Sequence, residues 1–313
     1  MRSDLILLLC LCSALVSPHN LDDNEYWSED YVNMCRGELY GVQGMSCFTY
    51  RIFIYSVRIE MRSVVPFVAV FKGIIPPSLV KSLLKDVDSK VLVEQKVVDL
   101  ENGGHTTHKG RAANGTSLSH KETATTRKII KYLQTTMPAI EFRSAEPFMV
   151  LHYTKGGHYA PHFDYIDYVD EAHADYYMKR FGNRFLTFLF LLRTADEGGG
   201  TLFPEIRSVV QPEVGDAIVW LNMDSSYGLE KGSLHGACPI RKGVKVAATL
   251  WVRIKGQEVL SPCHHTGIYT LESFLAPSPD KILHKRDFNC QTARGCIFKD
   301  SITSRIPEPW ATK

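Results

Sequence analysis

The sequence predicts an α+β protein in which an antiparallel jelly-roll or barrel core follows two helices. The main observation is a series of short apolar stretches separated by turns, at 148–152, 158–164, 184–193, 201–203, 217–221 and 244–254. Short strands with turns between them are typical of antiparallel β architectures. No helical period lies between these strands, which argues against a parallel α/β fold in this half of the chain.

Length and charge restrict the class of protein. The chain has 313 residues and a formal net charge of +2. Domains usually have about 100 to 200 residues, so this length suggests one domain of catalytic size with appendages. The nearly balanced charge gives no support for nucleic-acid binding through a strongly basic surface.

The first residues have the composition of a secretory signal peptide. Arg2 precedes the apolar run Leu5–Val16, and a polar, acidic segment follows. A membrane-spanning helix needs about 20 apolar residues, so the shorter run favours a cleaved signal over 1–17 and no membrane span. A buried N-terminal strand or a short signal anchor is the alternative. We therefore expect the protein in the lumen of the endoplasmic reticulum or elsewhere in the secretory pathway.

Cysteine usage in such a compartment predicts disulfides. Without Cys10 and Cys12, which the signal would remove, the remaining cysteines are Cys35, Cys47, Cys238, Cys263, Cys290 and Cys296. These six allow fifteen sets of pairs, so the sequence does not choose among them. Proximity favours the pairs Cys35–Cys47 and Cys290–Cys296. Cys238 would then pair with Cys263.

The triplet Asn114-Gly115-Thr116 fits the N-glycosylation acceptor pattern. In a secretory protein it predicts a glycan on Asn114 in a surface loop. Such triplets also arise by chance.

The N-terminal half predicts a lead-in, strands and two helices. Residues 21–47 lack a long apolar period and are expected to be irregular and fixed by a disulfide, and 51–71 favours two β-strands. Ser78 is expected to cap a helix with apolar residues at helical spacing. Ser119 and Glu122 form a capping-box pattern that would open a second helix.

The stretch His152–Asp164 contains the best candidate for a metal site. His162 and Asp164 are separated by one residue, and side chains two apart in an extended segment project to the same side. His235, near the start of another apolar stretch, is the best candidate for a third ligand. Two histidines and one carboxylate leave coordination positions open, as in non-haem Fe(II) oxygenases and unlike closed structural zinc sites.

In the last strand-like stretch, 244–254, every second residue from Val244 to Val252 is aliphatic. Lys245 lies on the opposite face of this stretch. It would face either solvent or the inside of the barrel. A lysine inside would need an anion, which a dicarboxylic acid cosubstrate could supply. A solvent-exposed lysine on an edge strand is the simpler alternative.

Five sequence blocks, taken together, carry a resemblance. They are HYAPHFD at 158–164, RFLTFLF at 184–190, GGGTLFP at 198–204, GDAIVW at 215–220 and HGACP at 235–239, followed by Lys245. Their order and spacing resemble the catalytic domain of prolyl 4-hydroxylases over about 64–257. Residues 35–38 also resemble the segment that precedes this domain in collagen prolyl 4-hydroxylase α subunits.

The resemblance implies a fold, cofactors and iron ligands. The implied fold is a double-stranded β-helix, or jelly roll, with flanking N-terminal helices. The implied cofactors are Fe(II), 2-oxoglutarate as cosubstrate and L-ascorbate. The iron ligands would be His162, Asp164 and His235, and both Cys238 and Cys263 have counterparts as a disulfide pair.

Four further residues match positions that contact small molecules in this family. Lys245 would pair with the distal carboxylate of 2-oxoglutarate. Thr187 and Tyr153 match residues that donate hydrogen bonds to that carboxylate. Tyr159 matches a residue beside the substrate proline.

The implied activity is hydroxylation of peptidyl proline at C4 in collagen-like or other proline-rich secretory proteins, with release of succinate and CO2. One alternative is the same chemistry on another residue or on a non-collagen protein. Another is a catalytically silent subunit that binds proline-rich peptides. The last residues are not a KDEL-type retention signal, so retention would need a partner, for which protein disulfide isomerase is the family precedent.

The predicted organisation has four parts. Residues 1–17 form the signal peptide, 18–62 a disulfide-fixed lead-in, 63–257 the catalytic domain and 258–313 a tail of unknown role. The resemblance is to short members of the family, without the N-terminal peptide-binding region of the collagen enzymes. Ala160 departs from the larger, acidic or amide residue that commonly stands there, which could alter the substrate groove.

Overall fold

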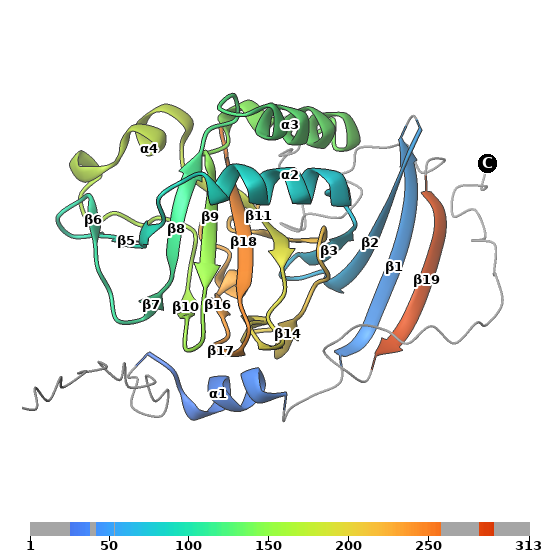
Figure 1. The fold of residues 1–313 in the computed structure, drawn as a ribbon, viewed down its shortest axis with the longest axis horizontal. Helices are drawn as coiled ribbons and strands as arrows, with labels where there is room; N and C mark the ends of the chain where they lie inside the picture. The colour runs from blue at the N-terminus through green and yellow to red at the C-terminus, as the bar shows by residue number, and fades with distance from the viewer. Residues whose placement is uncertain (1–25, 38–41, 53, 258–281, 291–313) are drawn as a thin grey trace, which may run out of the picture.

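The core of the fold is a pair of antiparallel sheets. The structure, a computed structural model, describes residues 26–37, 42–52, 54–257 and 282–290 (Figure 1). The larger sheet has the spatial order β19 (Ile282–Cys290), β1 (Val42–Ile52), β2 (Tyr55–Ser63), β3 (Val68–Lys72), β15 (Ala217–Leu221), β11 (Arg184–Arg193), β18 (Lys245–Arg253), β9 (Phe148–Tyr153), β8 (Asn114–Leu118) and β4 (Val93–Glu94). The smaller sheet has the order β14 (Ser208–Val210), β13 (Thr201–Phe203), β16 (His235–Ala237), β10 (His158–His162) and β7 (Arg111–Ala112).

Apolar side chains from both sheets meet in the space between them. Val70 and Trp220 of the larger sheet form one buried cluster with Phe203 and Val210 of the smaller sheet. Two short strand pairs complete the β structure: β12 (Glu197–Gly198) with β17 (Ile240–Lys242), and β5 (Val97–Val98) with β6 (His105–Thr106). The predicted jelly-roll core is therefore confirmed, and each predicted strand from 148 onward is present within one or two residues.

Two helices, α2 (Pro77–Asp88) and α3 (Ala124–Thr136), cover the outer face of the larger sheet (Figure 1). Their apolar residues join the largest buried cluster, for example Leu83 of α2 and Leu133 of α3. The predicted helix starts were wrong. The N-cap residues are Pro76, which makes no side-chain capping bond, and Thr123, whose side chain accepts from the Thr126 N–H.

The expected starts failed for local reasons. Pro77 is preset for the first helical turn, so α2 begins before Ser78. The Ser119 N–H does donate to the Glu122 carboxylate, over 2.9 Å, but this bond closes a turn ahead of α3. Shorter helical elements are α4 (Tyr176–Phe181), η2 (Phe142–Ser144), η3 (Glu171–His173) and η4 (Lys231–Ser233).

The prediction that the lead-in segment is irregular was wrong, because the segment contains helix α1 (Glu29–Arg36). Ser28 caps this helix, and Gly37 ends it in the left-handed conformation that glycine favours. Trp27 and α1 form a small buried cluster with residues of the smaller sheet, among them Leu202 and Val209. The helix thus lies beneath the smaller sheet, on the side away from the larger one (Figure 1).

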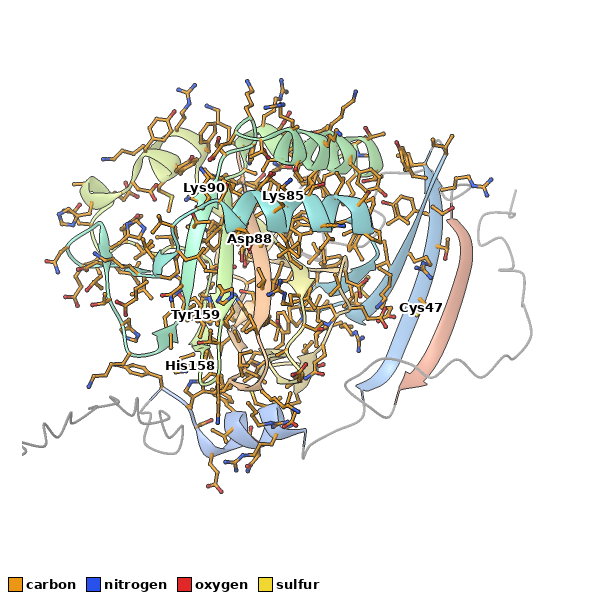
Figure 2. The ribbon with its side chains drawn as sticks, in the orientation of Figure 1. Cys47, Lys85, Asp88, Lys90, His158 and Tyr159 are labelled. Atoms are coloured by element: carbon orange, nitrogen blue, oxygen red, sulfur yellow. A yellow bond between two sulfur atoms is a disulfide. The ribbon has the colours of Figure 1, made fainter. Side chains whose placement is uncertain are left out.

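Cys35 of α1 forms a disulfide with Cys238, and their Cα atoms are 5.5 Å apart. The two predicted pairs that use these residues, Cys35–Cys47 and Cys238–Cys263, are therefore wrong. The physical reason is that α1 docks on the smaller sheet and carries Cys35 with it. Cys47 lies in β1, at the far side of the molecule (Figure 2). The pair Cys290–Cys296 is not tested, because Cys296 and the side chain of Cys290 lie outside the described residues, as does Cys263.

The region 42–72 forms three strands, where two were expected for 51–71. Strand β19, from the tail, pairs with β1 and extends the larger sheet. Asn114 is exposed but belongs to β8, so its predicted place in a loop was wrong, and its glycosylation stays a prediction. Residues 1–17 lie outside the described residues. No helix in the described ranges has the length and apolar composition needed to cross a bilayer.

Candidate active site

The three predicted metal ligands meet between two neighbouring strands of the smaller sheet. His162 ends β10, Asp164 follows two residues later, and His235 begins β16. The antiparallel register places His162 opposite His235. Strand pairing therefore brings the third ligand, distant in sequence, to the His162–Asp164 pair.

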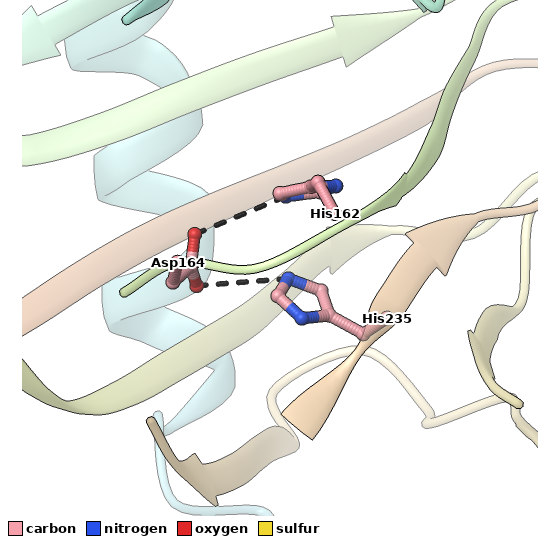
Figure 3. A group of neighbouring side chains, drawn as sticks. All are labelled: His162, Asp164 and His235. Atoms are coloured by element: carbon pink, nitrogen blue, oxygen red, sulfur yellow. Dashed lines mark ion pairs between the residues drawn. The ribbon is translucent and has the colours of Figure 1, made fainter. Parts of the chain in front are cut away.

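The ligand atoms of these residues face a common point. One ligand atom from each side chain lies within 4.8 Å of the other two. The His162 Nε2 is 3.8 Å from the Asp164 Oδ1, and the His235 Nε2 is 3.6 Å from the Asp164 Oδ2 (Figure 3). These separations exceed hydrogen-bond lengths, and an ion held by all three groups fits them.

Hydrogen bonds fix the tautomer of both imidazoles. The His162 Nδ1 is 2.8 Å from the Ala160 carbonyl oxygen, and the His235 Nδ1 is 2.8 Å from the Ser233 carbonyl oxygen. A carbonyl can only accept, so each Nδ1 carries the proton and donates it. Each Nε2 is then left with a free lone pair, which is the form that binds a metal.

Burial sets the charge states of the same groups. It lowers the pKa of His162 to about 3, with a further contribution from His235, and it lowers the pKa of His235 as well. Both imidazoles are therefore neutral at physiological pH. Burial alone would raise the pKa of Asp164, but the two imidazoles and Arg184 outweigh it and lower that pKa. Two neutral imidazoles and one carboxylate match the donor set of non-haem Fe(II) sites.

An inner pocket behind the ligands contains a buried lysine. Lys245 begins β18 opposite Tyr153 of β9, and only 3% of it is exposed. Its Nζ donates to the Gly199 carbonyl oxygen over 2.7 Å, and within the described ranges it forms no ion pair with a carboxylate. Burial lowers the pKa of Lys245 to about 8. A buried cation without an anion is costly, so the pocket fits a ligand that brings its own carboxylate.

Hydroxyl groups line this pocket with Lys245, among them those of Tyr153 and Thr201. Burial raises the pKa of Tyr153 to about 12, so its phenol remains protonated, and its ring centroid is 5.7 Å from the Lys245 Nζ. The Thr201 Oγ1 is buried and has no hydrogen-bond partner in the part of the chain that the structure describes. Thr201 was not among the predicted cosubstrate-binding residues, although it lies in the block at 198–204. Its unpaired hydroxyl is a second sign that the pocket takes a polar ligand.

Thr187 has partners other than those predicted. Its Oγ1 donates to the Asp164 Oδ2 over 2.8 Å and accepts from the Asn222 Nδ2 over 2.7 Å. Its one hydroxyl hydrogen is therefore used within the protein. The predicted contact with 2-oxoglutarate stays a prediction, and the contacts of the structure assign Thr187 to Asp164.

An outer groove opens on the other side of the ligands. Tyr159 stacks on His162, with ring centroids 3.6 Å apart and planes inclined by 19°, and the guanidinium of Arg111 lies 4.5 Å from the Tyr159 centroid. Tyr159 and its neighbour His158 are marked on β10 in Figure 2. Arg184 lies 3.7 Å from the Trp251 ring and forms an ion pair with Glu146.

The groove and the inner pocket share lining residues, among them Tyr159, His162 and Asp164. The metal site thus stands where two compartments meet. The inner one, with Lys245, suits a small carboxylate, and the outer one, with aromatic and guanidinium walls, suits a larger substrate.

Comparison with known proteins defines the class. Residues 148–253 match the family model described as the 2OG-Fe(II) oxygenase superfamily. This range contains His162, Asp164, His235 and Lys245. Over this range the chain is therefore similar to 2-oxoglutarate-dependent dioxygenases, whose cofactors are Fe(II) and 2-oxoglutarate.

Within this class the chain is similar to prolyl 4-hydroxylases, so the resemblance is confirmed. It is 28% identical over 244 residues to prolyl 4-hydroxylase subunit alpha-1 of Caenorhabditis elegans, covering 74% of this chain and 42% of that protein. It is 33% identical over 181 residues to the Rattus norvegicus subunit alpha-1, covering 58% and 33%. It is 28% identical over 232 residues to probable prolyl 4-hydroxylase 7 of Arabidopsis thaliana, covering 67% and 65%. The chain thus spans less than half the length of these two alpha subunits.

A solved structure of similar fold is the viral collagen prolyl hydroxylase of Paramecium Bursaria Chlorella virus-1 in complex with 2-oxoglutarate. The identity is 22% and the TM-score 0.44, over 59% of this chain and 94% of that one.

Proposed function

We propose that this chain is a procollagen-proline 4-dioxygenase, an Fe(II)- and 2-oxoglutarate-dependent enzyme that hydroxylates peptidyl proline at C4. The observation that carries the proposal is the junction at the three ligands. A buried lysine that pairs with no carboxylate of the described residues lies on one side of them, and an aromatic groove lies on the other. The similarity to prolyl 4-hydroxylases supports proline as the substrate residue.

The chain's own residues would hold the cofactors. His162, Asp164 and His235 would hold Fe(II), and Lys245 would bind the distal carboxylate of 2-oxoglutarate, with Thr201 and Tyr153 as hydroxyl donors. When bound, the metal and cosubstrate activate O2 for insertion into a C–H bond, with succinate and CO2 as products. Ascorbate, typical of the family, would keep the metal reduced.

The outer groove would position the peptide. A polyproline II segment is extended before it binds and loses little conformational entropy on binding, and aromatic walls are its usual recognition surface. Tyr159, stacked on His162, places such a wall directly beside the metal site. A proline ring against Tyr159 would therefore lie next to the reacting centre.

The decisive experiment measures succinate formed from 2-oxoglutarate with and without a (Pro-Pro-Gly)n peptide, together with oxygen gain in the peptide by mass spectrometry. Wild type should form succinate faster with peptide, and Lys245→Ala should not. A panel of collagen-like and other proline-rich peptides separates the substrate classes. The prolyl assignment is overturned if no proline peptide gains oxygen while 2-oxoglutarate is still consumed.

The location and partner are part of the proposal. The signal-like segment 1–17 supports the lumen of the endoplasmic reticulum, and family precedent supports protein disulfide isomerase as the retaining partner. Cell fractionation with affinity purification tests both. Retention in the lumen without a co-purifying isomerase would contradict the partner.

A further inference from the structure

Three buried polar side chains form a chain of hydrogen bonds on one side of the metal site. Asp164 follows β10, Thr187 lies within β11, and Asn222 follows β15 directly. Their exposed fractions are 3%, 0% and 0%. Three elements that are distant in sequence thus bring one carboxylate, one hydroxyl and one amide together without solvent.

The chain of bonds has a fixed direction. An ionised carboxylate can only accept, so the single hydroxyl hydrogen of Thr187 is donated to the Asp164 Oδ2, over 2.8 Å. The Thr187 oxygen is then left to accept, and the Asn222 Nδ2 donates to it over 2.7 Å. Each bond polarises the next, which strengthens a chain of this kind in a buried setting.

The far end of this chain is anchored to the backbone. The Asn222 N–H donates to the Phe185 carbonyl oxygen over 2.9 Å, and the Glu230 N–H donates to the Asn222 carbonyl oxygen over 3.0 Å. Thr187 is held in β11, which pairs with β15 on one side and β18 on the other. Asp164, by contrast, lies outside any strand.

The two histidine ligands are oriented by backbone carbonyls, so the carboxylate is the ligand that depends on side chains. We propose that Thr187 and Asn222 are positioning residues that fix the rotation of the Asp164 carboxylate for metal binding. The inference deepens the proposed function, since it concerns the same metal site. It gives Thr187 a role toward the metal ligand.

The effect of each substitution on metal affinity should reflect the direction of the hydrogen bonds. Thr187→Val keeps the shape but removes the hydroxyl, and loss of such an orienting bond costs about 10- to 100-fold in metal affinity. Thr187→Ser keeps the hydroxyl and should bind metal nearly as wild type does. Asn222→Leu should cost less than Thr187→Val. The double variant should match Thr187→Val alone, because Asn222 acts through the hydroxyl.

The experiment titrates Co(II) into the full chain freed of metal by a chelator, and follows the visible absorption bands of the bound ion. Circular dichroism and thermal unfolding confirm that each variant is folded. Thr136→Val is the matched control: Thr136 is equally buried, and its hydroxyl bonds only to backbone carbonyls at the end of α3. This control should leave Co(II) affinity unchanged.

Wild-type Co(II) affinity in folded Thr187→Val would overturn the inference, and so would equal losses in Thr187→Ser and Thr187→Val. Additive losses in the double variant would remove Asn222 from the role. If Thr187→Val does not fold, Asn222→Leu decides: weaker Co(II) binding than wild type supports the inference, and wild-type affinity in the folded variant overturns it. Co(II) binding needs no peptide, so failure of prolyl hydroxylation and failure of this inference are separate results.

Discussion

The metal ligands and the inner pocket lie side by side, but their polar groups are held in opposite ways. Each metal ligand has a partner that orients it: His162 and His235 donate to carbonyl oxygens, and Asp164 accepts from Thr187. In the inner pocket, within the described ranges, Lys245 forms no ion pair with a carboxylate and Thr201 has no hydrogen-bond partner. The first region is prepared before any ligand arrives. The second is left incomplete, so that a ligand carrying a carboxylate completes it.

This difference has a consequence for stability. Removing a group from the prepared region should lower both function and stability, because a partner is left buried and unpaired. Removing a group from the incomplete region should lower function but raise the stability of the ligand-free protein.

Substitution of a metal ligand should have the largest effect. Asp164→Ala removes the carboxylate from the three metal ligands and leaves the Thr187 hydroxyl without its acceptor. We expect activity to fall by more than about 100-fold, since loss of an orienting partner alone costs 10- to 100-fold. Succinate formation and Co(II) titration measure this effect. His152→Gln, on β9 and away from the ligands, is the control, and measurable Co(II) binding at wild-type affinity in Asp164→Ala would contradict the site.

Lys245→Met should separate function from stability. Removing one partner of a buried charge pair costs about 3 to 5 kcal/mol, so the 2-oxoglutarate KM should rise about 100-fold or more. The ligand-free variant should be more stable than wild type, because a buried cation without an anion is gone. Urea denaturation gives the stability, and Lys242→Met, at the exposed end of β17, is the matched control. A less stable Lys245→Met would show that the pocket is not incomplete.

The pH dependence of stability should report the same lysine. Burial lowers the pKa of Lys245 to about 8, from an ordinary value of 10.5. Between these values the unfolded chain binds a proton that the folded chain does not bind. The contribution of Lys245 to the free energy of unfolding should therefore be constant below this window. It should rise by about 3 kcal/mol in total as the pH increases across the window.

The wild-type curve minus the Lys245→Met curve isolates this contribution from other titrating groups. Urea denaturation below, within and above the window gives both curves. Saturating 2-oxoglutarate should reduce the difference, because a bound carboxylate keeps the lysine charged. Parallel curves in the absence of ligand would place Lys245 in contact with solvent.

The sequence predicted the prepared region better than the incomplete one. Alternation along an extended segment was enough to pair His162 with Asp164, and the position of His235 near the start of an apolar stretch, together with the five blocks, indicated the third ligand. The role of a threonine was harder to predict, because Thr187 and Thr201 both lie on strands and only the pairing of the sheets decides which one reaches the pocket. Thr187 lies in the larger sheet and meets Asp164, whereas Thr201 lies in the smaller sheet and lines the inner pocket.

Two of the wrong predictions, the irregular lead-in and the disulfide pairs, failed because they depend on long-range docking. Strands from 148 onward follow local patterns of apolar residues and turns. Helix α1 is short, and its place is decided by burial of Trp27 against the smaller sheet. That docking brings Cys35 to Cys238 across 203 residues of sequence, so proximity in the chain could not predict the pair.

Thr201→Val should give the smallest effect and the sharpest test of the comparison. A hydrogen bond to a charged group contributes about 1.5 to 3 kcal/mol, so the 2-oxoglutarate KM should rise about 10- to 150-fold. Co(II) affinity should not change, since Thr201 touches no metal ligand through a hydrogen bond. The ligand-free variant should be at least as stable as wild type, because an unpaired buried hydroxyl is removed. Thr187→Val, a substitution of the same chemistry, should show the reverse: weaker Co(II) binding and lower stability. Two threonine-to-valine changes thus distinguish a hydroxyl already in use from one that a ligand must complete, and identical behaviour of the two variants would erase the distinction.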